Sequence, residues 1–263
     1  MDKKESQKLM SDCLRKQLEF FGNAKKTILS SDKRLLRLFT DIPLSFFNLV
    51  AFSYLNRKEL LENIKDIKKY AKGRNTGLHW IVGPDDRPEG IKNILTRSGF
   101  KHQGNITGMS LSPIPEVDIG TDAKGLQISR VDDTKSLTEW LKVCMSDHPG
   151  HEKYFKKIIR FENSLGLGPG SKWLRFIAKL DEKAVATSAL FLADSATIVD
   201  NIATVKEHRK KGIANLMVRN LLGLSKDRGY DTVVLFSSDM GKDVYRSLGF
   251  KGDYQLSEYD IKD

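Results

Sequence analysis

The sequence contains little cysteine and proline and no long apolar run. Its two cysteines, Cys13 and Cys144, lie far apart and show no C-x-x-C spacing, so the pattern indicates neither a disulfide framework nor a zinc site. The longest apolar stretch, residues 42–55, is interrupted by serine and asparagine and is shorter than the ~20 residues that span a bilayer. The N-terminal residues are mixed in charge and lack an apolar signal core. We therefore expect a cytoplasmic protein with reduced thiols and no membrane partner.

The composition is typical of a folded chain with a basic surface. Hydrophobic residues make up 40% and charged residues 30% of the 263 residues, which allows two modest domains or one enlarged domain. The formal net charge of +10 favours polyanionic ligands. Because the lysines are spread along the chain and are not grouped with aromatics in a stripe, the charge does not favour a nucleic-acid partner over a solvated basic surface. A cofactor with several phosphates would also benefit from this charge.

The second half of the chain shows strand and helix patterns in the order β-α-α-β-β-β-α-β-α-β. Strands predicted at residues 197–204 and 232–236 flank a long helix at 210–228. Because a helical crossover joins parallel neighbours, the order predicts an α/β fold whose mixed, mostly antiparallel sheet has a site at its parallel step. The other expected elements are strands 126–131, 173–180 and 184–192, helices 134–144, 152–164 and 242–247, and a final strand.

The first half has a shorter series of the same kind. The expected elements are an amphipathic helix over residues 6–24, two strands within 35–55, a charged helix over 58–72, a strand at 79–82, a helix over 89–98 and a strand over 100–111. Residues 113–125 contain two prolines and little periodicity, which indicates a linker. We therefore place an N-terminal domain at 1–115, a linker at 116–125 and a second domain at 126–263.

One turn in the second domain has the chemistry of a phosphate site. A strand ends at Thr204, and the basic turn that begins at Arg209 opens the long helix. Unpaired backbone N–H groups in the first turn of a helix point outward, and the helix dipole adds positive potential. Gly212 and the small Ala214 would let an oxygen-rich ligand approach the backbone closely. A diphosphate fits this arrangement, although the turn taken alone also suits an ordinary basic helix start.

Residues 126–263 resemble the GCN5-related N-acetyltransferase family. Arg209, Gly212 and Ala214 match its core motif, which is Arg or Gln, two residues, Gly, one residue, then Gly or Ala. The strands at 201–204 and 233–238 also match, and residues 244–250 carry the family's Tyr-x-x-x-Gly-Phe ending. The resemblance implies a fold of that family, acetyl-CoA as co-substrate without a metal, and transfer of acetyl to a primary amine of a small molecule or protein. The alternative is a non-catalytic acyl-CoA-binding or interaction module.

The resemblance also assigns residues to the coenzyme. It implies that the strand before the turn hydrogen-bonds the pantetheine arm and that the amides after Arg209 hold the diphosphate. Lys210 and Lys211 either add charge at the phosphates or are solvated lysines, and Ser237 and Ser238 either touch the pantetheine or cap the next helix. The full set is Ile202, Ala203, Thr204, Arg209, Lys210, Lys211, Gly212, Ile213, Ala214, Asn215, Ser237 and Ser238.

Two residues are candidates for catalysis. Tyr245 matches the position from which family members protonate the leaving thiolate, the alternative being a tyrosine that packs the core. Asp200 holds one of two family positions for a base or amine anchor, the alternative being a strand-edge carboxylate that orients a water; Ile198 holds the other and cannot serve. The family geometry implies that a backbone amide near Ile202 or Ala203, freed by a strand bulge, donates to the oxyanion.

Two further features extend the hypothesis. His148 and His151 are three residues apart, but a Pro-Gly turn separates them and no carboxylate or thiol cluster accompanies them, so we expect acceptor contact and no metal. Residues 93–101 echo residues 243–251, each between two strand patterns, which indicates an internal duplication. The first half resembles the degenerate partner of tandem acetyltransferases, and we expect it to act as a scaffold that binds no coenzyme.

Overall fold

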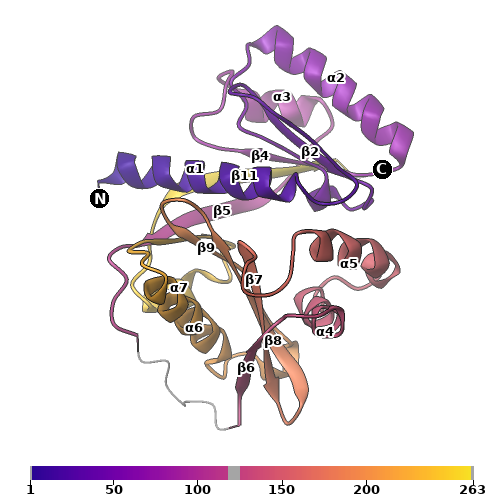
Figure 1. Ribbon diagram of the computed structural model, residues 1–263. Coiled ribbons are helices and arrows are strands. Elements are labelled where there is room, and N and C mark those ends of the chain that lie inside the picture. Colours follow the sequence, from indigo (N-terminus) through magenta and orange to yellow (C-terminus); the bar gives the residue numbers. More distant parts are fainter. Residues whose placement is uncertain (1, 118–124, 262–263) are drawn as a thin grey trace. The chain divides into compact units, whose positions relative to one another are not determined.

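The chain forms two compact units in a computed structural model that describes residues 2–117 and 125–261 (Figure 1). The larger unit contains Met1–Gln17 and Gly108–Asp253, and the smaller unit contains Leu18–Thr107 and Tyr254–Asp263. Part of the predicted linker, residues 118–124, lies outside the described residues. Within the described ranges, no helix combines the length and apolar character needed to cross a membrane.

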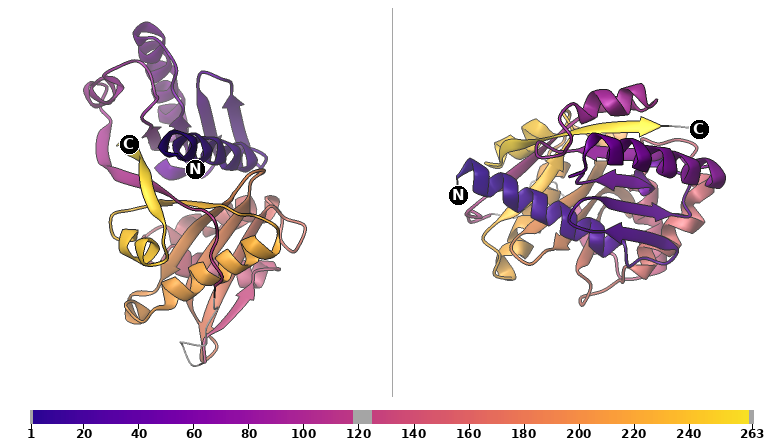
Figure 2. Two further views of the ribbon diagram at one scale, coloured as in Figure 1. Left: turned by 90° about the vertical axis from the view of Figure 1, so that its left-hand side faces the viewer. Right: turned by 90° about the horizontal axis from the view of Figure 1, so that it is seen from above.

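The larger unit is built on a mixed sheet in the strand order β5-β10-β9-β8-β7-β6. β9 and β10 are parallel, whereas β6, β7, β8 and β9 are joined by antiparallel pairing, so the predicted α/β fold with its parallel step is confirmed. Helices α6 and α7 cover one face of this sheet and α4 and α5 lie on the other (Figure 1 and Figure 2). The strands are β5 (Lys101–Leu111), β6 (Gln127–Arg130), β7 (Trp173–Leu180), β8 (Lys183–Leu192), β9 (Thr197–Thr204) and β10 (Val233–Ser237), and the chain then enters β11 (Lys251–Ile261), most of which belongs to the smaller unit. The helices are α1 (Lys3–Phe21), α4 (Thr134–Cys144), α5 (Phe155–Ser164), α6 (Ile213–Asp227) and α7 (Lys242–Ser247), with short 3-10 turns at η2 (Glu152–Tyr154) and η3 (Lys206–His208).

Local sequence signals set several boundaries in this unit. Asp181 and Glu182 both have positive φ, which gives the tight turn that matches the twist of the β7-β8 hairpin. α4 begins at a capping box in which the side chains of Asp133 and Ser136 bond each other's backbone N–H groups. α6 begins three residues later than the predicted start, because Gly212 and the preceding turn adopt left-handed backbone angles that a right-handed helix excludes.

The smaller unit repeats part of this arrangement. β3 and β4 are parallel and are joined by the helix α2, as β9 and β10 are joined by α6. α3 and β5 then follow β4, as α7 and β11 follow β10, in agreement with an internal duplication. β1 was missed by sequence reasoning, because most of its residues are exposed and give no hydrophobic alternation. The elements are β1 (Thr27–Ser31), β2 (Leu36–Thr40), η1 (Ser45–Phe47), β3 (Leu49–Ala51), α2 (Arg57–Arg74), β4 (Leu78–Val82) and α3 (Ile91–Arg97).

The last strand of each half of the sequence lies, at least in part, in the unit formed mainly by the other half. β11 pairs antiparallel with β4 and, from Tyr254 onward, belongs to the smaller unit. β5 lies beside β10 in the strand order, and its residues from Gly108 belong to the larger unit. Compactness therefore divides the chain differently from sequence order, and the predicted boundaries at 115 and 126, which describe the duplicated halves, stay a prediction.

A buried histidine ties β11 to the smaller unit. The Nδ1 atom of His79 lies 2.6 Å from Oδ1 of Asp260, and its Nε2 atom lies 3.4 Å from Oε1 of Glu258. Ser45 donates to the other oxygen of Asp260 at 2.9 Å. Burial lowers the pKa of His79, but the hydrogen bonds and charges of the two carboxylates outweigh burial and raise this pKa to about 9.

The charged form of His79 should make stability depend on pH. A folded-state pKa raised from 6.5 to about 9 gives stability that is complete below the lower value and is lost as pH rises through the upper one. In Asp260→Asn the partner charge is gone, so the midpoint of thermal unfolding should fall less steeply over this window than in the unchanged protein. His102→Gln, at an exposed histidine of the same unit, should keep the original slope. Parallel curves for Asp260→Asn and the unchanged protein would contradict this assignment.

Candidate active site

The site begins where β9 separates from its neighbours. The parallel pairing of β9 with β10 extends from Thr197 to Val199 only, so within the described residues the β9 backbone from Asp200 to Thr204 has no strand partner on that side. On the other side the register with β8 shifts, because Thr187 lies opposite Ala203 whereas Ala189 lies opposite Asp200. The structure thus has a bulge and an open strand edge at the predicted position.

Asn201 is the residue that forms the bulge. Its φ of 50° is left-handed, a conformation that asparagine tolerates better than most residues. The hydroxyl of Thr187 donates to the Asn201 carbonyl at 3.0 Å, and the thiol of Cys144 lies 3.4 Å from the Asn201 side-chain oxygen. The bulge is therefore held from both β8 and α4.

The predicted coenzyme turn leaves its amides without backbone acceptors. Lys210 and Gly212 have φ values of 60° and 77°, and Gly212 caps α6 without a side-chain hydrogen bond. The first helical bond runs from Leu216 to the Gly212 carbonyl, so among the described residues the backbone N–H groups from 210 to 215 have no backbone acceptor. Ile213 is buried and anchors the helix start in the core. Such a turn is suited to bind an anion.

The side chain of Arg209 connects this turn to the end of β9 and to the loop after α4. Its Nε atom donates to the Thr204 carbonyl at 2.8 Å, and its guanidinium pairs with Asp147. Lys210 and Lys211 are exposed, so their charge is available to a ligand but is also fully solvated. Arg209 therefore joins the end of β9 to the loop after α4.

Tyr245 and Asp200 are far apart in sequence, but in the fold the charge of Asp200 acts on Tyr245. Burial raises the pKa of Tyr245 to about 12, and the charge of Asp200 contributes. The Tyr245 ring packs against Phe250 with centroids 6.0 Å apart. A Cβ at Gly241 would lie 3.1 Å from the Tyr245 ring, so this glycine allows the close start of α7. The phenol thus stays protonated over the usual pH range and can act as an acid.

The serines after β10 differ in exposure. The hydroxyl of Ser237 is buried and donates to the Ser238 carbonyl at 2.7 Å, whereas Ser238 is exposed. Ser237 therefore stabilises the turn that leads into α7. Ser238 is open to solvent, and its predicted contact with the coenzyme stays a prediction.

Both carboxylate oxygens of Asp200 accept hydrogen bonds. Oδ1 accepts from the backbone N–H of Asn201 at 2.7 Å, and Oδ2 accepts from the Gln17 side chain at 2.9 Å. Burial raises the pKa of Asp200, the two hydrogen bonds oppose this rise, and the charge of Glu162 adds to it. A carboxylate of raised pKa is a stronger base than an exposed one. Gln17 was missed by sequence reasoning because it lies on a helix at the other end of the chain.

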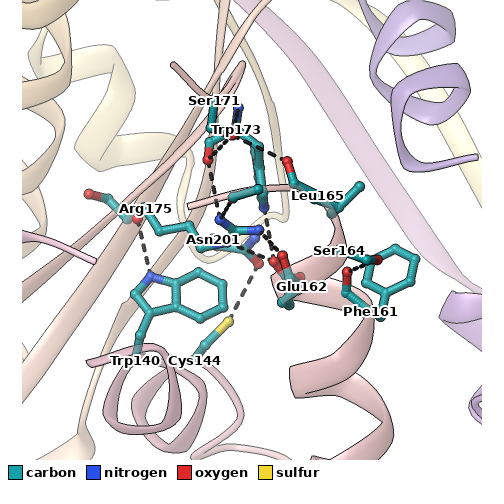
Figure 3. A network of polar contacts seen from close by, with 12 residues as sticks. Trp140, Cys144, Phe161, Glu162, Ser164, Leu165, Ser171, Trp173, Arg175 and Asn201 are labelled. Carbon is teal, nitrogen blue, oxygen red and sulfur yellow. Dashed lines mark hydrogen bonds and ion pairs between the residues drawn. The ribbon is translucent and has the colours of Figure 1, made fainter. Parts of the chain in front are cut away.

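A buried polar network supports the site from behind (Figure 3). Glu162 accepts from Nε of Arg175 at 2.7 Å and from the indole of Trp173 at 3.0 Å. Arg175 is almost completely buried and also donates to the carbonyls of Gly166 and Glu162, at 3.0 and 2.8 Å. Burial raises the pKa of Cys144, with Glu162 and Asp200 adding to the rise, so this thiol is an inert structural donor. No local pattern in the sequence predicts this network, because its members come from separate elements.

The loop that contains His148 and His151 is linked to the predicted coenzyme turn by an ion pair of Asp147. The rings of His148 and His151 stack in parallel with centroids 5.5 Å apart, and Asp147 of the same loop pairs with Arg209. In the described part of the chain, no group of three or more potential metal ligands is found. The predicted role of these histidines in acceptor contact stays a prediction.

Comparison with known proteins finds a family match for the segment that carries this geometry. Residues 172–252 match the model of the acetyltransferase (GNAT) domain, and this segment contains every predicted coenzyme and catalytic residue. Over 85 residues the chain is 34% identical to human N-acetyltransferase 8B and 29% identical to human N-acetyltransferase 8. Each alignment covers 29% of this chain and 37% of the relative, so the chain spans little more than a third of the curated relatives it matches.

Solved structures share the fold over nearly the whole chain. A GCN5-related N-acetyltransferase from Kribbella flavida superimposes with a TM-score of 0.72 at 16% identity and covers 98% of this chain and 96% of its own. A tandem GNAT protein from the clavulanic acid biosynthesis pathway gives 0.57 at 11% identity and covers 95% of both chains. Residues 172–252 therefore match a GNAT acetyltransferase domain, and the solved structures show that the whole chain shares the fold of these proteins.

The buried ion pair allows a stability prediction. Arg175→Met should lower the free energy of unfolding by about 3 kcal/mol or more, because it leaves the charge of Glu162 buried without its partner. Lys179→Met, on the same strand as Arg175, breaks a partly exposed ion pair with Glu139 of α4 and should cost only about 0–1 kcal/mol. Urea unfolding measures both, and equal losses in the two variants would show that the network is not the stabilising element described.

Proposed function

We propose that the chain is an N-acetyltransferase that moves an acetyl group from acetyl-CoA to a primary amine of a small molecule or protein. The observation that carries the proposal is the set of unpaired amides from 210 to 215 at the start of α6. Amides of this kind suit the diphosphate of coenzyme A, and the open edge of β9 suits its amide-bearing arm. The names of the human relatives, N-acetyltransferases 8B and 8, agree with this activity.

Each chemical need of the reaction has a residue at the site. An alkylamine with a pKa near ~10.4 must lose a proton before it attacks, and Asp200 accepts this proton directly or through water. A backbone amide near Ile202 or Ala203, beside the bulge, donates to the oxygen that gains negative charge. Tyr245 keeps its proton because burial raises its pKa, and it donates that proton to the departing thiolate.

The smaller unit contributes no second coenzyme site in this proposal. α2 corresponds to α6, but its first turn is closed by a capping box in which the Asn56 side chain accepts from the Glu59 backbone N–H at 3.0 Å. The carboxylate of Glu59 accepts from the Asn56 backbone N–H at 2.9 Å and also pairs with Arg34. A negative charge at this helix start repels a diphosphate. The smaller unit is therefore a scaffold.

The remaining partners follow from the chemistry of the site. An amine-bearing acceptor is the partner that the reaction requires, and neither a metal nor a nucleic acid enters the proposed steps. The structure gives both cysteines as free thiols, which agrees with the proposed cytoplasmic location.

Two measurements on the purified chain test the proposal directly. Calorimetric titration should register saturable binding of coenzyme A and acetyl-CoA, and a screen of amines and peptides should detect thiol release that depends on acetyl-CoA. Binding without thiol release for any amine would favour a non-catalytic acyl-CoA-binding module. Absence of binding by a folded protein would end the proposal.

Gly212→Glu should abolish coenzyme binding. The new carboxylate would stand among the unpaired amides at a left-handed position, where it repels the diphosphate and takes the amides for itself. Gly229→Glu is the matched control, since Gly229 also has a positive φ and open surroundings but lies at the other end of α6. This control should lose similar stability and still bind coenzyme in calorimetry. Unchanged affinity in Gly212→Glu would remove the diphosphate from this turn.

Tyr245→Phe should spare coenzyme binding and lower kcat by about 100-fold, the low end of the usual effect of a general acid. The ring that packs against Phe250 is kept, and only the proton donor is lost. Tyr230→Phe removes a phenol that donates to the Ala193 carbonyl in the same unit and should leave kcat unchanged. Steady-state rates of thiol release measure both variants, and an unaltered kcat in Tyr245→Phe would make this residue a packing tyrosine only.

A further inference from the structure

A glutamine occupies the buried stripe of helix α1. The residues of this stripe lie at helical spacing, and the others that belong to the larger unit are small or apolar: Ser6, Met10, Cys13 and Leu14. Gln17 continues the stripe and is only 3% exposed. A buried side-chain amide costs free energy unless it is hydrogen-bonded, so this position needs a polar partner.

That partner is the proposed base. The Nε2 atom of Gln17 donates to Oδ2 of Asp200 at 2.9 Å, and the Asn201 backbone N–H holds the other carboxylate oxygen at 2.7 Å. Two donors from different elements fix the plane of the carboxylate. Both donate to its oxygens, so both favour the ionised form.

The other groups that act electrostatically on Asp200 do not favour its ionised form as Gln17 does. Glu162 from α5 is negative and opposes ionisation of Asp200, although Arg175 pairs with it. Tyr245 from α7 and Cys144 from α4 both have raised pKa values and stay neutral, so neither supplies a positive charge. Among the described residues, Gln17 is the side chain that donates a hydrogen bond to Asp200.

We propose that Gln17 is a positioning residue that fixes the side chain of Asp200 and favours its ionised form, so that helix α1 forms part of the active site. The inference rests on the proposed function for its catalytic meaning, whereas the contact itself can be tested without turnover. It joins Gln17, which lies outside the family match at residues 172–252, to a residue inside that match.

The test follows the titration of Asp200 itself. Carboxyl carbon resonances of ¹³C-aspartate-labelled protein are recorded against pH, and Asp200→Asn assigns the Asp200 signal by its loss. Gln17→Met keeps the length of the side chain and removes the donor, so the Asp200 pKa should rise by about one unit, as loss of one hydrogen bond to a charged group predicts. Ser6→Ala, which removes another buried polar contact of α1 within the same unit, should leave the titration unchanged.

Enzymatic rates extend the same comparison. The acid limb of the kcat/KM profile should move upward by the same amount in Gln17→Met and stay in place in Ser6→Ala, with coenzyme affinity equal in all three proteins. If Gln17→Met does not fold, the Gln17 side-chain NH₂ signals of the unchanged protein decide the matter, because they should shift with the midpoint of Asp200. The inference would be overturned if the Asp200 pKa were the same in Gln17→Met and in the unchanged protein. It would also be overturned if the Gln17 NH₂ signals did not shift at the midpoint of the Asp200 titration. Absence of turnover in the unchanged protein would instead count against the proposed function, with the titration still deciding the contact.

Discussion

The break in the β9 ladder at Asn201 is the constraint on which the rest of the site depends. A strand paired on both sides would present neither a free edge nor an amide to a ligand. Here the left-handed Asn201 shifts the register with β8, and pairing with β10 has already ended at Val199. The same break orients Asp200, since the Asn201 N–H bonds one of its carboxylate oxygens. The open edge of β9 and the orientation of the proposed base Asp200 therefore both result from the bulge at Asn201.

A bulge of this kind needs support, and the larger unit supplies it with buried polar groups. Thr187 and Cys144 hold Asn201 directly, and the Glu162–Arg175 pair fills the space behind them. A buried ion pair is weak support for stability, because its desolvation offsets much of its attraction. Its position beside Asp200 suggests a different use, since the charge of Glu162 raises the pKa of the proposed base. The Glu162–Arg175 pair is thus part of the buried core and also affects the pKa of Asp200.

Sequence reasoning succeeded where local signals decide the structure and failed where distant contacts do. The bounds of α4, β7, β9 and α7 agree with the expectation because periodicity, capping residues and tight turns are local. The start of α6 was placed too early, since the pattern does not reveal the left-handed backbone of Lys210. Gln17 and Asp200 are 183 residues apart, so no local pattern could join them. The sequence also could not predict that β11 pairs with β4 of the smaller unit, because the two halves have similar strand patterns and the last strand could pair in either.

The two halves show how one fold can serve two purposes. In α2 the Asn56 side chain accepts from the Glu59 backbone N–H and the Glu59 carboxylate accepts from the Asn56 backbone N–H, and such a cap is worth about 1 kcal/mol. In α6 the corresponding position is Gly212, which offers no side chain, and the amides stay open. The start of α6 is instead anchored by the buried Ile213, and much of the helix packs in the core of the larger unit. The start of α6 therefore leaves amide donors open, as the proposed diphosphate site requires, whereas the start of α2 is capped.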